Sequence, residues 1–189
     1  MGGNIVHSNY KNINYNIYEL VNKFYSRQKI IEGYDEQYKN TYQTECNAFN
    51  ENFSQNHEFN DENICYKSMY YLNEIQRQYH SKEDSGCIYL YYWIYDNCKG
   101  KCAKTKIIDI YIYLINKYKE QNDPVCTEHE ENSISKYEFD KLKDIYDIKK
   151  EHTDSENYDA YCNKFRLIYM KRKDECDYKA HSDFCNALE

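Results

Sequence analysis

The chain has 189 residues, a net charge of −7 and 17% aromatic residues, with 24 tyrosines against 7 phenylalanines. One proline and five glycines are too few turn residues for a many-stranded sandwich, so the composition favours an all-α fold. The negative charge argues against a dedicated nucleic-acid binder, because affinity for phosphates relies on clustered cations. No apolar run reaches the roughly 18 residues of a membrane span, and "MGGNIVHSNYKNINYNIY" lacks the apolar core of a secretory signal.

The predicted elements are helices, because apolar residues recur at intervals of three and four along most of the chain. Residues 105–120 are rich in β-branched residues that would also suit a strand, but their length and wide apolar face favour a helix. In chain order, we expect helices near 12–27, 34–50, 64–80, 86–98, 105–120, 136–150 and 156–173. Polar loops are expected at 50–63, 80–86, 121–133 and 174–189.

The sequence therefore predicts a single α-helical domain over residues 1–189. We expect a disulfide-braced bundle of about five to seven helices with long loops. Pro124 is expected to stop the helix before it, and Ser135 with Glu138 forms a capping box ahead of the helix near 136–150.

The segment "CIYLYYWIYDNC", residues 87–98, places four tyrosines and the only tryptophan between two cysteines. Helical spacing puts Ile88, Tyr91 or Tyr92, and Tyr95 on one side. A recognition surface is one interpretation, because tyrosine is common in binding sites. We favour a core aromatic helix with at least one buried face, formed by Tyr91, Tyr92, Trp93 and Tyr95.

Nine cysteines are spread along the chain instead of forming Cys-x-x-Cys pairs, a pattern that favours disulfides and an oxidising destination. If consecutive helices run antiparallel, Cys46, Cys65, Cys98, Cys102 and Cys162 fall near one end of the bundle. Cys87, Cys126, Cys176 and Cys185 fall near the other end. The expected pairs are Cys46–Cys65, Cys87–Cys126, Cys176–Cys185, and Cys162 with Cys98 or Cys102, which leaves one cysteine over.

The cysteines and histidines could also form a metal site or a catalytic site. Cys98, Cys102, Cys126 and His129 are residue types that bind zinc, but their spacing is loose and five further cysteines stay unexplained. No cysteine or histidine lies in a recognisable nucleophile motif, and no phosphate-binding glycine loop is present. We therefore expect no enzyme activity and no cofactor.

Two segments resemble a known family. "CIYLYYWIYD" (87–96), preceded by "CYKSMYYLN" (65–73), resembles the PIR (vir-type) variant antigens of malaria parasites, whose domains carry a Cys-x-Tyr-Leu-x-Tyr-Trp-Ile/Leu-Tyr-Asp segment. "YDAYCNKFRLIYMKRKDEC" (158–176) is similar to their second characteristic motif. The similar segments cover roughly half of the chain. The cysteines outnumber the family's common pattern, so no pairing is carried over from it.

The resemblance implies a variant protein exported to the infected red cell, with an α-helical ectodomain and a C-terminal membrane anchor that this chain does not include. It implies host cell-surface receptors or host antibodies as partners, membrane contact only through that anchor, and no catalytic residues. The expected loops would present variable sequences for antigenic variation. The alternative is an intracellular structural or adaptor domain with reduced cysteines and an optional zinc ion.

Overall fold

The computed structural model describes residues 17–53, 63–79, 84–98, 102, 104–126, 136–154, 158–178 and 183–188. These residues form α-helices and short 3₁₀ segments, and no strand occurs among them. The elements are α1 (Ile17–Leu20), η1 (Val21–Lys23), α2 (Phe24–Glu32), η2 (Glu36–Tyr42), α3 (Gln43–Phe53), α4 (Ile64–Tyr79), α5 (Asp84–Cys98), α6 (Lys104–Lys119), α7 (Lys136–Asp154), α8 (Tyr158–Tyr178) and α9 (Asp183–Leu188). The all-α, disulfide-braced bundle predicted from the sequence is confirmed, with α3 to α8 as its longer described helices.

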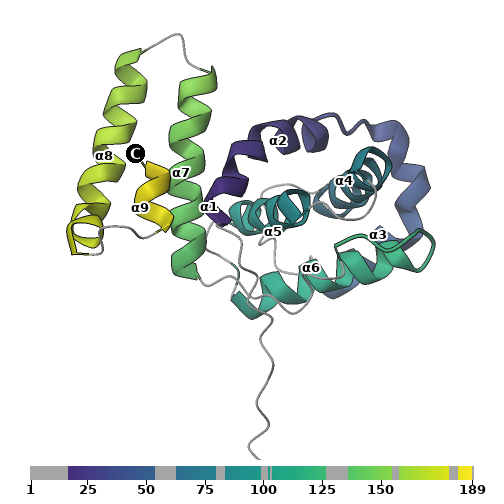
Figure 1. Ribbon diagram of the computed structural model, residues 1–189. Coiled ribbons are helices and arrows are strands. Elements are labelled where there is room, and N and C mark those ends of the chain that lie inside the picture. Colours follow the sequence, from purple (N-terminus) through teal and green to yellow (C-terminus); the bar gives the residue numbers. More distant parts are fainter. Residues whose placement is uncertain are drawn as a thin grey trace, which may run out of the picture.

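The helices are arranged around α5. Helices α2, α4 and α6 pack against α5, and α7 packs against α1 and η1 on one side of this group. Figure 1 shows α8 at the outer edge of the molecule, with α7 between it and the helices α1 to α6. The short helix α9 packs on α1 and α7. Within the part of the chain that the structure describes, no helix is long and apolar enough to cross a bilayer.

The core is built largely from tyrosine. Residues 85–92 of α5 are all buried, so this helix is covered on every side and not on one face alone. The ring of Phe24 on α2 lies 5.2 Å from that of Tyr89 on α5. Two of the buried hydroxyls have partners inside the protein: the Tyr71 hydroxyl donates to the Gly86 carbonyl at 3.0 Å, and the Tyr118 hydroxyl donates to Gln76. One continuous cluster of buried side chains extends from Tyr18 to Cys185.

Polar side chains cap two of the helix ends by hydrogen-bonding to the backbone. The Asp35 side chain accepts from the Gln37 amide at 2.8 Å and caps η2. After α6, the Asn122 side chain donates to the Tyr118 carbonyl at 3.0 Å, two residues before the helix-stopping Pro124. Ser135, the expected cap of α7, lies outside the described residues.

Several boundaries differ from the sequence prediction, and the expected helix near 34–50 is divided into η2 (Glu36–Tyr42) and α3 (Gln43–Phe53). The first expected helix is interrupted, because α1 and α2 are separated by the 3₁₀ turn η1 at Val21–Lys23. The segment 174–189, expected to be a loop, holds the end of α8 and the short helix α9, so that prediction is wrong. A helix of six residues shows too few periods to be recognised. It is held in place by burial of Phe184 and by the disulfide at Cys185.

Candidate functional site

Four disulfides brace the described helices, and three of them are pairs expected from the sequence. Cys46–Cys65 joins α3 to α4, and Cys87–Cys126 joins the start of α5 to the segment after α6. Cys176–Cys185 joins α8 to α9. Their Cα atoms are 5.3–5.5 Å apart, which is the usual spacing across a disulfide.

The fourth disulfide corrects the sequence prediction. Cys98 pairs with Cys102 across the connection between α5 and α6, and Cys162 keeps a free, half-buried thiol. The expectation that Cys162 would bind Cys98 or Cys102 is therefore wrong. It assumed that helix ends on the same side of the bundle meet, but α8 packs on α7, and α7 separates it from α5 (Figure 1).

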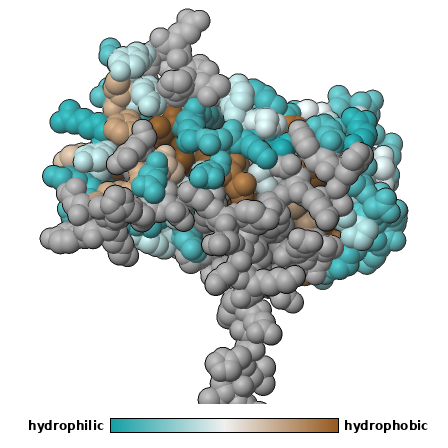
Figure 2. All heavy atoms as spheres, in the orientation of Figure 1, coloured by the Kyte–Doolittle hydropathy of each residue, from teal (hydrophilic) through white to brown (hydrophobic). Residues whose placement is uncertain are grey.

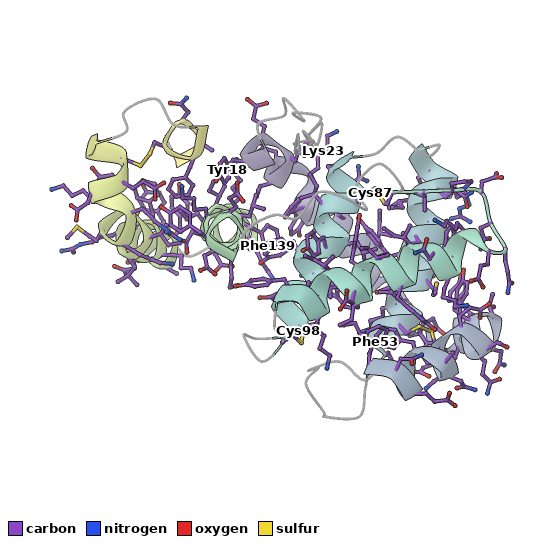
Figure 3. All side chains as sticks on the ribbon, turned by 90° about the horizontal axis from the view of Figure 1, so that it is seen from below. Tyr18, Lys23, Phe53, Cys87, Cys98 and Phe139 are labelled. Atoms are coloured by element: carbon purple, nitrogen blue, oxygen red, sulfur yellow. A yellow bond between two sulfur atoms is a disulfide. The ribbon has the colours of Figure 1, made fainter. Side chains whose placement is uncertain are left out.

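The candidate zinc site is also not assembled. Cys98, Cys102 and Cys126 all take part in disulfides, a state in which their sulfurs offer no thiolate to a metal. The fourth candidate ligand, His129, lies outside the described residues. Cys87 and Cys98 lie on opposite ends of α5, so the two disulfides that hold these three cysteines are well separated (Figure 3).

The aromatic residues singled out on α5 belong to the core. Tyr91 and Tyr92 are buried, and Trp93 and Tyr95 are half-buried. Burial raises the pKa of Tyr91 to about 12, and burial followed by nearby carboxylates raises that of Tyr92. The rings of Tyr91 and Tyr92 therefore serve the scaffold, and those of Trp93 and Tyr95 pack against the core while keeping part of their surface exposed.

Phe139 on α7 joins the outer helices to this aromatic core. Its ring stacks on Tyr95 at 4.9 Å and meets the edge of Tyr91 at 4.8 Å, and Figure 3 shows it pointing from α7 toward α5 and α6. The Tyr95 hydroxyl donates to Asp140 at 2.8 Å. The aromatic segment of α5 thus fixes the position of α7 against the rest of the fold.

Helix α8 is attached to α7 by charged residues that are shielded from solvent. Asp144 of α7 accepts from Arg172 Nε at 2.8 Å and from Lys171 Nζ at 3.0 Å. Asp144 and Arg172 are both buried. One turn further on, the more exposed Asp147 lies 3.3 Å from Lys164 of α8. Asp144 and Arg172 compensate each other's charge in the buried interface, so removing either one would leave the other charge buried without a partner.

A second charged contact lies where α9 covers the same interface. Glu175 of α8 accepts from Lys141 and from the Tyr137 hydroxyl of α7. Burial alone would raise the pKa of the Glu175 carboxyl, but these two hydrogen bonds hold it below its usual value. The Lys141 ammonium also lies 4.9 Å from the centre of the Phe184 ring.

The outer side of α8 carries large apolar side chains that face solvent. The expected helix near 156–173 has an apolar set in which Ile168 is buried and three residues are half-buried, whereas two tyrosines are exposed: Tyr161, Cys162 and Phe165, and Tyr158 and Tyr169. Tyr158, Leu167 and Met170 are 74%, 70% and 66% exposed. Figure 2 shows tan and brown side chains reaching the surface over the α7–α8 side of the molecule. Sequence periodicity missed this surface, because the side of α8 that meets α7 is largely charged.

Parts of all four loops expected to contact partners fall outside the described residues, namely 54–62, 80–83, 127–133, 179–182 and 189. Residues 121–126 are described and lie outside helices, as expected. The other described parts belong to α3, α5, α8 and α9, except Asn63, which lies in a turn.

Comparison with known proteins gives no match, because no protein-family model, curated protein or solved structure resembles the chain significantly.

Proposed function

We propose that this chain is a non-enzymatic ectodomain of a PIR-type variant antigen, displayed at the surface of infected erythrocytes. Its role in this proposal is contact with a host cell-surface receptor and evasion of host antibodies by sequence variation. The observation that carries the proposal is the disulfide frame. Eight of the nine cysteines are cross-linked, and two of the four disulfides lie at the ends of α5, the helix that bears the family-like motif.

The disulfide frame favours an oxidising, extracellular location. Disulfides persist outside the cytosol and are rare within it, where glutathione keeps thiols reduced. Cys87–Cys126 closes 39 residues and Cys46–Cys65 closes 19, so these bonds restrict much of the unfolded chain. An intracellular adaptor with reduced cysteines would gain nothing from this arrangement.

The position of the motif supports a division between scaffold and contact surface. Tyr91, Tyr92 and Leu90 of the motif are buried, so relatives that share these residues would share a core. Segments outside that core can change without disturbing it. Such an arrangement suits a protein that presents different surfaces on one fold.

The proposal is tested by screening the oxidised 189-residue chain against an array of host cell-surface ectodomains. The same chain, reduced and alkylated at all cysteines, serves as the control. We expect saturable binding to at least one ectodomain by the oxidised chain and none by the control. Equal binding by both forms, or binding to no ectodomain, would contradict the proposed function.

A further inference from the structure

The Cys98–Cys102 disulfide spans the shortest segment of the four described disulfides. It closes 4 residues, against 9, 19 and 39 for the others. Cys98 is the last residue of α5, and Cys102 lies two residues before Lys104, the first residue of α6. Helices α5 and α6 also pack directly on each other, and Cys87–Cys126 ties the start of α5 to the segment after α6. The Cys98–Cys102 bond can therefore open and close while the helices stay in place.

Only one sulfur of this disulfide is within reach of a solute. Cys98 is 1% exposed and belongs to the buried core, whereas Cys102 is half-buried. Figure 3 shows Cys98 at the end of α5 that lies away from Cys87. Thiol–disulfide exchange depends on access to the sulfur that is attacked. An external thiol can therefore attack this disulfide at Cys102 but not at Cys98.

The sequence around Cys102 carries positive charge alone. Four lysines and no acidic residue lie within four positions of it: Lys99, Lys101, Lys104 and Lys106. The first turn of α6 follows directly and contains no acidic residue. A helix N-terminus and nearby ammonium groups both stabilise a thiolate. A Cys102 thiolate released by reduction is therefore stabilised, which makes the disulfide easier to reduce.

The surroundings of Cys98 have the opposite character. Cys98 ends α5, where the helix dipole disfavours an anion. Two acidic residues lie near this end of α5: Asp96 is 3.3 Å from Lys143, and Asp140 accepts from the Tyr95 hydroxyl at 2.8 Å. Cys98 is therefore suited to stay a neutral thiol after reduction and to lose its proton only when it attacks to re-form the bond. The pair thus combines an accessible sulfur that exchanges with a buried sulfur that closes the bond again.

From these features we infer that Cys98–Cys102 is a redox-active disulfide that exchanges with an anionic low-molecular-weight thiol, such as glutathione. The glutathione thiolate attacks Cys102 Sγ, the Cys98–Cys102 bond breaks, and the Cys98 sulfur leaves with the electron pair and takes a proton from water. A second glutathione thiolate attacks the glutathione sulfur of this mixed disulfide, and Cys102 leaves as a thiolate. The protein disulfide is thereby reduced to a dithiol, and two glutathione molecules are oxidised to glutathione disulfide. The reverse steps re-form the bond, and none of this chemistry depends on the proposed function.

Cys176–Cys185 provides a comparison within the same chain. It also pairs a half-buried cysteine, Cys176, with a buried one, whereas both cysteines are buried in the two remaining disulfides. Cys176 lies near the C-terminal end of α8, where the helix dipole disfavours a thiolate. An anionic thiol should therefore prefer Cys102 over Cys176. The charges around Cys176 are balanced, since three acidic and three basic residues lie within four positions of it: Asp174, Glu175, Asp177, Arg172, Lys173 and Lys179.

The test uses the oxidised 189-residue chain with Cys162→Ser, so that the free thiol takes no part. Reduced glutathione is added at neutral pH, acid stops the reaction, and peptide mapping by mass spectrometry measures how fast each cysteine acquires glutathione. We expect Cys102 to react about tenfold faster than Cys176, because electrostatic steering accelerates association by a factor of about ten or more. Cysteamine is a cationic thiol, so its ratio of rates at Cys102 and Cys176 should be at least about fivefold lower.

Charge variants test whether the lysines cause the preference. Lys101→Glu with Lys104→Glu reverses two charges beside the attacked sulfur. This double variant should slow the reaction of glutathione at Cys102 by at least about fivefold. It should leave the rate at Cys176 unchanged, because that site lies on a different helix.

A second double variant is the matched control. Lys29→Glu with Lys119→Glu reverses the same number of charges at exposed positions on α2 and at the far end of α6. It should change the rate at Cys102 by less than about twofold, because distant surface charges are screened. The rate at Cys176 also reports folding, since a variant that unfolds would open every disulfide faster.

A rate at Cys102 no higher than that at Cys176 overturns the inference, and so does glutathione attached to Cys98. An equal preference with cysteamine, or no slowing in the Lys101 and Lys104 variant, overturns the assignment to an anionic thiol. Far-UV circular dichroism is recorded after Cys98–Cys102 alone has been reduced. Unchanged helix content is expected, and a loss of helix content would contradict reversible opening of this bond.

Discussion

Replacing Asp144 with asparagine should strongly destabilise the contact between α7 and α8. The Asp144 carboxylate accepts from Arg172 at 2.8 Å and from Lys171 at 3.0 Å, and the Arg172 guanidinium is buried with it. The Asp144→Asn variant keeps the shape and one acceptor but leaves the buried arginine charge uncompensated. Breaking a buried pair in this way typically costs about 3–5 kcal/mol. We expect about 3 kcal/mol, since asparagine retains an acceptor and Lys171 can turn to solvent.

Asp147 supplies a matched control on the same helix. It lies three residues later, is more exposed, and is 3.3 Å from both Lys143 and Lys164. Exposed pairs of this kind contribute about 0–1 kcal/mol. Asp147→Asn should therefore change stability by less than about 1 kcal/mol, although it removes the same charge from the same interface.

Thermal and urea unfolding, both followed by far-UV circular dichroism, measure the two variants with the disulfides intact. For a chain of this length, about 3 kcal/mol corresponds to a fall in Tm of about 6–12 °C, against less than about 4 °C for Asp147→Asn. The Asp144→Asn loss should shrink when Arg172→Met removes the unpaired charge as well. Equal losses for the two single variants would refute the view that burial, and not charge alone, makes the Asp144 contact important.

Three further predictions concern the core, the disulfides and alkaline pH. Leu114→Ala, at a buried site on α6, should cost about 3–4 kcal/mol, whereas Leu167→Ala, at an exposed position on α8, should change stability by less than about 0.5 kcal/mol. Both are measured by urea unfolding, and equal costs would contradict the assignment of Leu167 to the surface. Loop entropy predicts that replacing Cys87 and Cys126 with serine costs about 4 kcal/mol and replacing Cys98 and Cys102 costs about 2 kcal/mol. The difference arises because the first disulfide closes 39 residues and the second closes 4. A lower urea midpoint for the Cys98 and Cys102 variant would contradict this prediction. Burial raises the pKa of Tyr91 to about 12, so the folded chain keeps this proton while the unfolded chain loses it near pH 10. Stability should thus fall between pH 10 and 12, and an unchanged urea midpoint between pH 9 and 11 would exclude this effect.

Much of the fold could be predicted from periodicity and cysteine placement. Helices α4 to α6 begin and end within about two residues of their expected bounds, because each buries a wide apolar face. The pairs Cys46–Cys65 and Cys87–Cys126 follow from the antiparallel order of neighbouring helices. In these regions local spacing and tertiary packing agree.

The predictions that failed depend on which helices are neighbours. Periodicity places residues on a face but does not say what covers that face. Cys162 and Cys98 were expected at the same end of the bundle, yet α7 lies between their helices, α8 and α5. The apolar spacing placed Phe165 and Ile168 on the less exposed side of α8, but it gave no sign of the charged contact between Arg172 and Asp144 on that side. Only the arrangement in space reveals that Leu167 and Met170 are exposed.

The central claim is that a single free thiol remains in an otherwise cross-linked scaffold. The most direct measurement is alkylation of the denatured, unreduced chain, followed by peptide mapping with mass spectrometry. We predict one alkylated cysteine, Cys162, and bridges at Cys46–Cys65, Cys87–Cys126, Cys98–Cys102 and Cys176–Cys185. Nine alkylated cysteines would contradict the claim and support an intracellular domain with reduced thiols, and a bridge to Cys162 would contradict the position of α8.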